Sequence, residues 1–114
     1  MYLPNRKNAV IPKDKITNYL LSTSHPVGKH KAAYFTNIGF EIIKPEVLIH
    51  SLKQIAEEST VTETIKTDFG TKYVIDGNIY APNQRSYLLR TVWMIENNSD
   101  TAYLVTAYPL QLVN

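Results

Sequence analysis

Two histidines and two lysines lie within seven consecutive positions, at His25, Lys29, His30 and Lys31. On a helical wheel, Lys31 falls in the middle of an apolar stripe formed by Val27, Tyr34, Phe35 and Ile38. A lysine at that angle extends to solvent or binds an anion, because burying an unpaired ammonium is costly, and a nearby helix N-terminus favours phosphate. Histidine exchanges protons near neutral pH. The segment therefore predicts a phosphate-binding, acid–base site, and the alternative is a solvent-directed lysine beside two surface histidines.

Arg90 is the second residue that breaks its local pattern. It points to the same face of an expected strand as three apolar residues, Leu88, Val92 and Met94. The guanidinium fork suits bidentate recognition, so an arginine at this position needs a buried carboxylate or a ligand phosphate. The first alternative makes Arg90 part of a structural salt bridge, and the second makes it a substrate-binding residue.

Thr106 and Tyr108 are expected on one face of the last strand, together with Leu104. A five-residue loop in the hairpin at 95–101 would place Arg90 beside Thr106, whereas a four-residue loop would place Thr91 there. Threonine and tyrosine can hydrogen-bond a phosphate, and tyrosine can also stack on a base. Without a ligand, Thr106 and Tyr108 would form an ordinary cross-strand polar pair.

These residue types, without a well-placed carboxylate, suit metal-independent cleavage of RNA. A histidine can accept the 2′-hydroxyl proton or protonate the leaving oxygen, and the cations stabilise the charge that builds on phosphorus. Glycoside hydrolysis needs a pair of carboxylates, and a metal enzyme needs histidines at ligand spacing with acids. The four scattered glycines form no phosphate-binding loop. We therefore expect neither a metal nor a cofactor.

The composition is that of a globular protein. The chain has 114 residues, 44% of them hydrophobic and 19% charged, and it contains no cysteine, which excludes disulfides, a cysteine nucleophile and thiolate metal sites. The net charge is only +2, but residues 1–31 carry six lysines and arginines against the single acid Asp14. This basic third favours an anionic partner, or simply solvates the surface. No apolar run approaches the roughly 20 residues that span a bilayer, and no secretory signal is recognisable. We expect one cytoplasmic domain over residues 1–114.

The apolar spacing changes once along the chain, near residue 58. The helical spacing before it predicts helices at about 13–21, 26–38 and 45–57. The third helix has an expected buried stripe of Leu48, Leu52, Ile55 and Ala56, with His50 on the opposite, solvated side. The alternation after residue 58 predicts strands at about 60–68, 71–80, 86–95 and 101–108. This order predicts an α+β fold with the helices packed on one face of a four-stranded antiparallel sheet.

Several segments resemble a small bacterial domain of unknown function, the 6883 family. They are residues 3–5, 19–22, 24–31, 39–40, 70–73, 90–93 and 106–109, so the resemblance covers nearly the whole chain. Members of this family are similar to the barnase–EndoU–colicin–RelE-like nucleases, which implies helices on a four-stranded sheet and a role in toxin–antitoxin or polymorphic-toxin systems. The resemblance implies a catalytic set of His25, His30, Lys31, Arg90, Thr106 and Tyr108. We also expect RNA contacts from Lys29, Lys72 and Trp93.

The sequence therefore favours a metal-independent endoribonuclease that acts as the toxin of a bacterial toxin–antitoxin pair. Its expected partners are RNA and a cognate antitoxin or immunity protein, and we expect no association with a membrane. Two other functions compete on the same fold: a non-catalytic RNA- or protein-binding module, and an antitoxin or immunity-type protein. If the chain is a nuclease, either His25 or His30 must converge with the rest of a smaller set within roughly 10 Å, about the reach of one nucleotide: Lys31, Arg90 and Thr106.

Overall fold

Helical segments come first in the chain and strands follow, which confirms the α+β fold predicted from the sequence. The computed structural model describes residues 1–22, 24–26 and 29–110. The helical elements are the 3₁₀ turn η1 (Arg6–Asn8), α1 (Lys13–Lys15), the π-helical turn η2 (Ile16–Leu20), α2 (Lys29–Asn37) and α3 (Pro45–Glu58). The strands are β1 (Val61–Lys66), β2 (Gly70–Tyr80), β3 (Ser86–Glu96) and β4 (Ala102–Pro109).

The first two predicted helices differ in detail from the helices that form. The stretch 13–21 begins as α1 and widens into η2, where the N–H of Leu21 donates to the carbonyl of Ile16 at 2.8 Å. The described part of α2 begins at Lys29, although the N–H of Lys29 donates to the carbonyl of His25 at 3.1 Å with helical spacing. Val27, which was predicted on the apolar stripe of this helix, lies outside the described residues.

The four strands form one antiparallel sheet in the order β1-β2-β3-β4. A bulge between Val92 and Trp93 shifts the pairing of β3 with β4, so Val92 pairs with Thr106 and Trp93 pairs with Leu104. The predicted neighbours of Thr106 are therefore wrong, because neither expected loop length allows for an extra residue inside the strand. The partner of Arg90 is Tyr108. Leu104 is fully buried while Thr106 is not, so the expectation that they share a face is also wrong.

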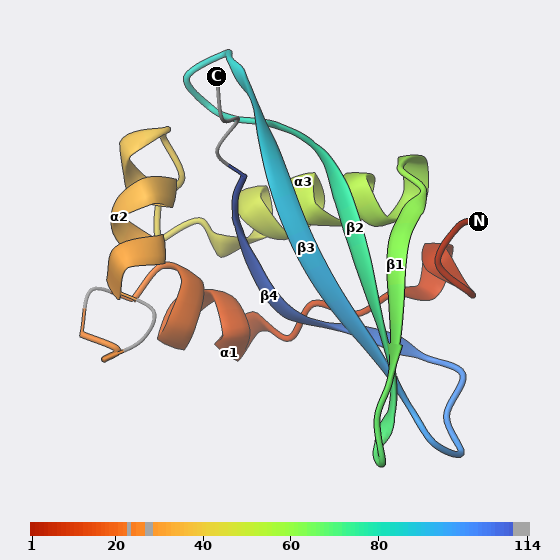
Figure 1. The fold of residues 1–114 in the computed structure, drawn as a ribbon. Helices are drawn as coiled ribbons and strands as arrows, with labels where there is room; N and C mark the ends of the chain where they lie inside the picture. The colour runs from red at the N-terminus through yellow and green to blue at the C-terminus, as the bar shows by residue number, and fades with distance from the viewer. Residues whose placement is uncertain (23, 27–28, 111–114) are drawn as a thin grey trace.

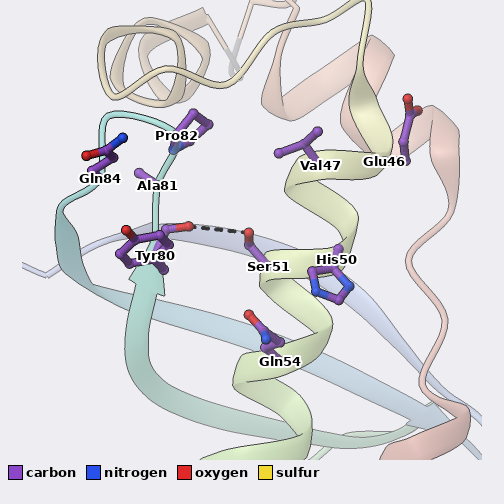
Figure 2. Close-up of a pocket in the computed structure, with 9 residues that line it drawn as sticks. All are labelled: Glu46, Val47, His50, Ser51, Gln54, Tyr80, Ala81, Pro82 and Gln84. Carbon is purple, nitrogen blue, oxygen red and sulfur yellow. Dashed lines mark hydrogen bonds between the residues drawn. The ribbon is translucent and has the colours of Figure 1, made fainter.

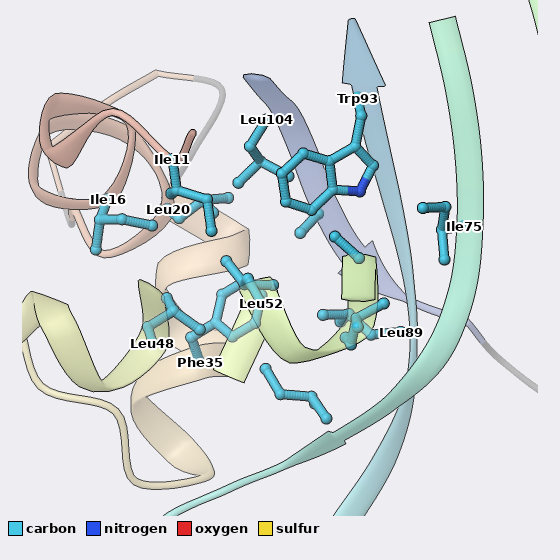
Figure 3. Packing of buried hydrophobic residues seen from close by; sticks show 14 of the residues in the cluster. Ile11, Ile16, Leu20, Phe35, Leu48, Leu52, Ile75, Leu89, Trp93 and Leu104 are labelled. Carbon is cyan, nitrogen blue, oxygen red and sulfur yellow. The ribbon is translucent and has the colours of Figure 1, made fainter. Parts of the chain in front are cut away.

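The core lies between the sheet and α3, which crosses one face of the sheet (Figure 1). The predicted stripe of α3 is buried, with Leu48, Leu52 and Ala56 fully inaccessible and Ile55 2% exposed. Figure 3 shows Leu48 and Leu52 packed with Phe35 of α2, and Trp93 between Leu104 and Ile75. In Figure 1, α2 and the segment that begins with α1 lie beyond the β4 edge, and Tyr19 of this segment hydrogen-bonds Thr106 of β4.

The N-terminal segment contacts both edges of the sheet. The carbonyl of Met1 accepts a hydrogen bond from the N–H of Val61 in β1 at 2.7 Å. Nine residues later, Val10 forms an isolated parallel bridge with Tyr103 of β4, which the prediction of an antiparallel sheet did not include. Among the helices of the described ranges, none has the length and apolar character to cross a membrane.

Candidate functional site

Tyr19 stands at the centre of a polar cluster between η2, α2 and β4. Its hydroxyl lies 3.2 Å from Oγ1 of Thr106, so the two groups share a hydrogen bond. The ring of His25 meets the Tyr19 ring edge-on, with the centroids 5.0 Å apart and the planes at 74°. The wide π-helical turn η2 carries Tyr19, and such turns recur at functional sites. We call Tyr19, His25, Lys31, Thr106 and Lys15 the Tyr19 cluster.

Two lysines bring positive charge to the same phenol ring. Nζ of Lys15 lies 5.3 Å from the Tyr19 ring centroid, and Nζ of Lys31 lies 5.5 Å from it. Both are within the range of a cation–π contact. Burial raises the pKa of Tyr19, but the hydrogen bonds with Thr106 and Lys31, together with the two lysine charges, outweigh burial and lower that pKa below its ordinary value. The phenol at the centre of this cluster therefore releases its proton more readily than a free tyrosine.

A second feature, the α2–β4 pocket, adjoins the Tyr19 cluster through Lys31. This open pocket has a volume of about 460 Å³ and is lined by His30, Lys31, Tyr34, Tyr108 and Pro109. His30, Lys31 and Tyr34 share one face of α2, because residues three and four apart are neighbours on a helix. Tyr108 and Pro109 come from β4. The predicted residues His30, Lys31 and Tyr108 therefore line one hollow.

Arg90 lies beside Tyr108 but is held by a carboxylate. Its Nε and Nη2 donate to the two carboxylate oxygens of Asp76, at 2.8 and 2.9 Å. The hydrogen bonds with Asp76 raise the pKa of Arg90 above its ordinary value, and Tyr108 adds a smaller contribution in the same direction. The expectation that no carboxylate is well placed is therefore wrong at this position. Of the two alternatives for Arg90, the structure contains the salt bridge.

The residues predicted to contact RNA lie in three different environments. Lys29 is exposed at the start of α2. Lys72 is partly exposed on β2, opposite Met94, and is four residues from Asp76, or about 13 Å along the strand. Trp93 is fully buried, and its Nε1 donates to Oγ1 of Thr91 at 2.8 Å. The predicted RNA contact by Trp93 is wrong, because the alternation of β3 turns this ring into the core.

Tyr19 and Lys15 were not among the predicted site residues. Helical spacing puts Tyr19 on one apolar face with Ile16 and Leu20, and its ring does pack against the core. The available signal was an aromatic residue with a hydroxyl group four positions after Lys15 on a helical stretch. That spacing predicts a contact between the two side chains, but it does not reveal that Thr106 reaches the hydroxyl from the other end of the chain.

A second pocket, larger than the α2–β4 pocket, lies between α3 and the loop after β2. It has a volume of about 580 Å³ and is lined by Glu46, Val47, His50, Ser51, Gln54, Tyr80, Ala81, Pro82 and Gln84. Figure 2 shows its walls, with the Ser51 hydroxyl donating to the Tyr80 carbonyl at 3.4 Å. Neither lysine nor arginine lines this pocket. Its only formal charge is the carboxylate of Glu46 when His50 is neutral, so it suits an anionic ligand poorly. His50 is exposed, as predicted.

No group of three or more histidine, cysteine, aspartate or glutamate side chains within the described ranges is arranged to hold a metal ion. The Tyr19 cluster and the α2–β4 pocket instead combine two imidazoles, two ammonium groups and several hydroxyl groups, counting His25, His30, Lys15 and Lys31. Groups of these types bind phosphate oxygens and exchange protons.

Comparisons with known proteins place the chain in a family. Among curated proteins, none matches the sequence. Among solved structures, a chain of a contact-dependent growth inhibition toxin–immunity protein complex from Klebsiella pneumoniae 342 is similar, with a TM-score of 0.71 and 14% identity over 93% of this chain and 97% of that chain. At that identity, the match establishes a shared fold. The family model for a domain of unknown function (DUF6883) matches residues 2–111, and the chain therefore belongs to this family.

Proposed function

We propose that this protein is an endoribonuclease that cleaves RNA by attack of a 2′-hydroxyl group, without a metal ion. The observation that supports the proposal most directly is the arrangement around Tyr19. A proton-exchanging phenol, an imidazole, an ammonium group and a hydroxyl group meet there, on the side chains of Tyr19, His25, Lys31 and Thr106. Cleavage of a phosphodiester needs an acid, a base and positive charge beside the phosphorus, and these residues supply all three.

In the proposed reaction, the 2′-oxygen attacks phosphorus while the 2′-hydroxyl proton passes to His25. The bond between phosphorus and the 5′-oxygen breaks, and that oxygen takes a proton from the Tyr19 hydroxyl. The products are a 2′,3′-cyclic phosphate and a 5′-hydroxyl end. Lys31 stabilises the charge that builds on the non-bridging oxygens, and Thr106 donates a hydrogen bond to one of them. DNA lacks the attacking hydroxyl and is not a substrate.

The structure changes the role that we assign to Arg90. Its guanidinium is paired with Asp76 and lies beside Tyr108, so it is a positioning residue in this proposal rather than a phosphate ligand. Lys31 carries the main charge-stabilising role, because no carboxylate lies within ion-pair distance of its side chain among the described residues. His30 lines the neighbouring pocket and is the second candidate for the base.

The test is an RNA-cleavage assay with EDTA present throughout. Lys31→Ala is expected to lower the rate about 10²- to 10³-fold, by analogy with the loss of one preorganised donor at a developing negative charge. Lys66→Ala removes the same charge from β1, at the opposite edge of the sheet from β4, and is the matched control. His25→Gln and His30→Gln decide which imidazole is the base. A requirement for a divalent metal, or equal cleavage of RNA with a 2′-deoxy group at the scissile position, would overturn the mechanism.

We further propose that this nuclease acts as a toxin with a cognate antitoxin or immunity protein. The similar fold in a complex of a growth inhibition toxin with its immunity protein supports a place in such a system. The same match supports the alternative that the chain is the immunity-type component. Expression of the chain alone distinguishes the two roles: a toxin arrests growth, and the product of the neighbouring gene relieves the arrest. An immunity-type protein leaves growth unchanged and cleaves no RNA.

A further inference from the structure

The α2–β4 pocket is lined by two tyrosine rings and a lysine, and one of the rings is held by aromatic neighbours. The Tyr34 ring is held edge-to-face by Phe35, with centroids 5.4 Å apart, and by Tyr87, with centroids 6.2 Å apart. Tyr108, across the pocket, is paired with Arg90 in the sheet. Rings that are held in place before binding lose little conformational freedom when a ligand stacks on them. The pocket is therefore suited to a flat aromatic ligand.

The hydroxyl group of Tyr34 remains protonated at neutral pH. Burial raises the pKa of Tyr34, and the neighbouring Tyr87 raises it further. Tyr34 can therefore donate a hydrogen bond while its ring stays uncharged. His30, four residues earlier on the same helix face, adds an imidazole that can donate or accept. The pocket thus offers both a stacking surface and polar groups for the edge of a heteroaromatic ring.

Lys31 connects this pocket with the Tyr19 cluster. Its side chain lines the pocket, and its Nζ lies 5.5 Å from the Tyr19 ring centroid. A ligand in the pocket that also carries a phosphate would place that phosphate beside Lys31. A nucleotide has this composition: a flat heteroaromatic base joined through a sugar to a phosphate. A volume of about 460 Å³ lies within the range of small-ligand sites.

We propose that the α2–β4 pocket binds one unpaired nucleobase of the RNA, between Tyr34 and Tyr108, next to the phosphodiester at the Tyr19 cluster. This inference rests on the proposed ribonuclease function and adds a recognition subsite to it. A base can enter such a pocket only when it has left a duplex, so the preferred substrate is single-stranded RNA, such as a loop. In this arrangement the base stacks on the Tyr34 ring, and the phosphate of the same nucleotide lies beside the ammonium group of Lys31.

The experiment measures the binding of short single-stranded RNAs by fluorescence anisotropy. The 2′-hydroxyl of every nucleotide is blocked as a 2′-O-methyl group so that no RNA is cleaved, and a series of these RNAs replaces one nucleotide at a time by an abasic site. We expect one abasic position to weaken binding to the wild-type protein about 10- to 100-fold, the usual effect of losing one stacked base. Tyr34→Leu should weaken binding of the intact oligonucleotide to a similar degree and be insensitive to that abasic site. Tyr34→Phe keeps the ring and should retain most of the affinity.

Wild-type binding that is equal across the whole abasic series would overturn the base pocket, and that result does not depend on whether any variant folds. The cleavage assay is separate, so the two proposals can fail independently. Cleavage of RNA without an abasic effect on binding would support the ribonuclease proposal and contradict the base pocket. An abasic effect on binding without cleavage of RNA would support the base pocket and contradict the ribonuclease proposal. A duplex of the same sequence that binds as tightly as the single strand also contradicts the inference.

Discussion

A tyrosine gives up its proton more readily near neutral pH when its surroundings favour the anion, and Tyr19 is surrounded by groups that do. Burial opposes ionisation, but the hydroxyl of Thr106 and the charges of Lys31 and Lys15 outweigh it. The three residues come from β4, α2 and α1. The chemistry of this single phenol therefore depends on three elements, and Thr106 of β4 lies 87 residues further along the chain than Tyr19.

Tyr19 is expected to ionise at a lower pH than an ordinary tyrosine. Its folded-state pKa lies below the usual value, so the tyrosinate absorbance near 295 nm should rise earlier in a pH titration of the wild-type protein than in Tyr19→Phe. Lys31→Met should move this early rise to higher pH, because it removes both a hydrogen bond and a charge. Tyr80→Phe removes a tyrosine that is 61% exposed and is the control for the loss of one ring. An unchanged titration in Tyr19→Phe would contradict the assignment.

The ion pair between Arg90 and Asp76 is expected to contribute modestly to stability. The two side chains are 35% and 20% exposed, and partly exposed pairs of this kind contribute up to about 1 kcal/mol to the free energy of unfolding. Asp76→Asn should therefore lower that free energy by no more than about this amount, as measured by urea unfolding. Asp68→Asn, which removes an exposed carboxylate outside this ion pair, is the control. A loss several times larger would mean that the pair also holds β2 and β3 in register.

At the scale of elements, hydrophobic periodicity predicts the helices and strands, but it does not reveal an irregularity caused by a single extra residue. The stripe of α3 and the four strands follow from helical spacing and alternation, which extend over many residues. The bulge at Val92 and Trp93 depends on one extra residue, Val105, within a run of strand-forming residues, so alternation alone does not reveal it. The α-helical repeat of 3.6 residues per turn does not reveal the π-helical turn at Tyr19 either. These two irregularities help to place Thr106 against Tyr19, which is why the candidate site was harder to predict than the fold.

Gly77 of β2 lies directly against the C-terminal end of α3. The triplet formed with Asp76 and Asn78 is typical of a turn, yet β2 continues straight through it. A Cβ atom on Gly77 would lie 2.6 Å from Oγ of Ser59 and 3.0 Å from Cγ2 of Ile55. Glycine is therefore required by packing at this position.

Gly77→Ala is expected to lower the free energy of unfolding by about 1–3 kcal/mol, the usual cost of overfilling a packed contact. The measurement is urea unfolding followed by the fluorescence of Trp93, the only tryptophan, which is fully buried in the fold. Ser59→Gly should restore part of the loss when it is combined with Gly77→Ala, because it removes the nearest atom. Asn78→Ala, at an exposed neighbouring position, is the control. Equal stability of Gly77→Ala and wild type would show that α3 can shift away from β2.

At the scale of the whole molecule, the small net charge of +2 conceals an uneven distribution. Of the basic residues of the N-terminal third, Lys15 and Lys31 contact Tyr19 beside Thr106 of β4, and Lys29 is exposed at the start of α2. An RNA strand would therefore meet positive charge where the candidate acid and base lie. A modest net charge is compatible with nucleic-acid binding when the charge is concentrated in this way.

RNA binding is expected to weaken as salt increases, with a slope that reports the number of phosphate contacts. Lys15→Ala and Lys31→Ala should each reduce the slope of log K against log salt by about 0.7, the value for one contact on a single strand. Lys66→Ala, on β1, should leave the slope unchanged. Affinity can be measured by anisotropy at four or more salt concentrations. Equal slopes for all three variants would mean that the RNA backbone follows another path across the protein surface.

The bridge between Val10 and Tyr103 has a consequence for how the protein is made. Asn5 also reaches across the chain, with Nδ2 donating to the carbonyl of Asp100 at 2.9 Å. On the ribosome, residues 1–10 emerge about ninety residues before β4, so this segment must wait for its partner until β4 has been made. Thr106 and Tyr108 arrive with the same late strand. A nascent chain from which β4 has not yet emerged therefore lacks the β4 half of the candidate site, so that site can assemble only after β4 has left the ribosome.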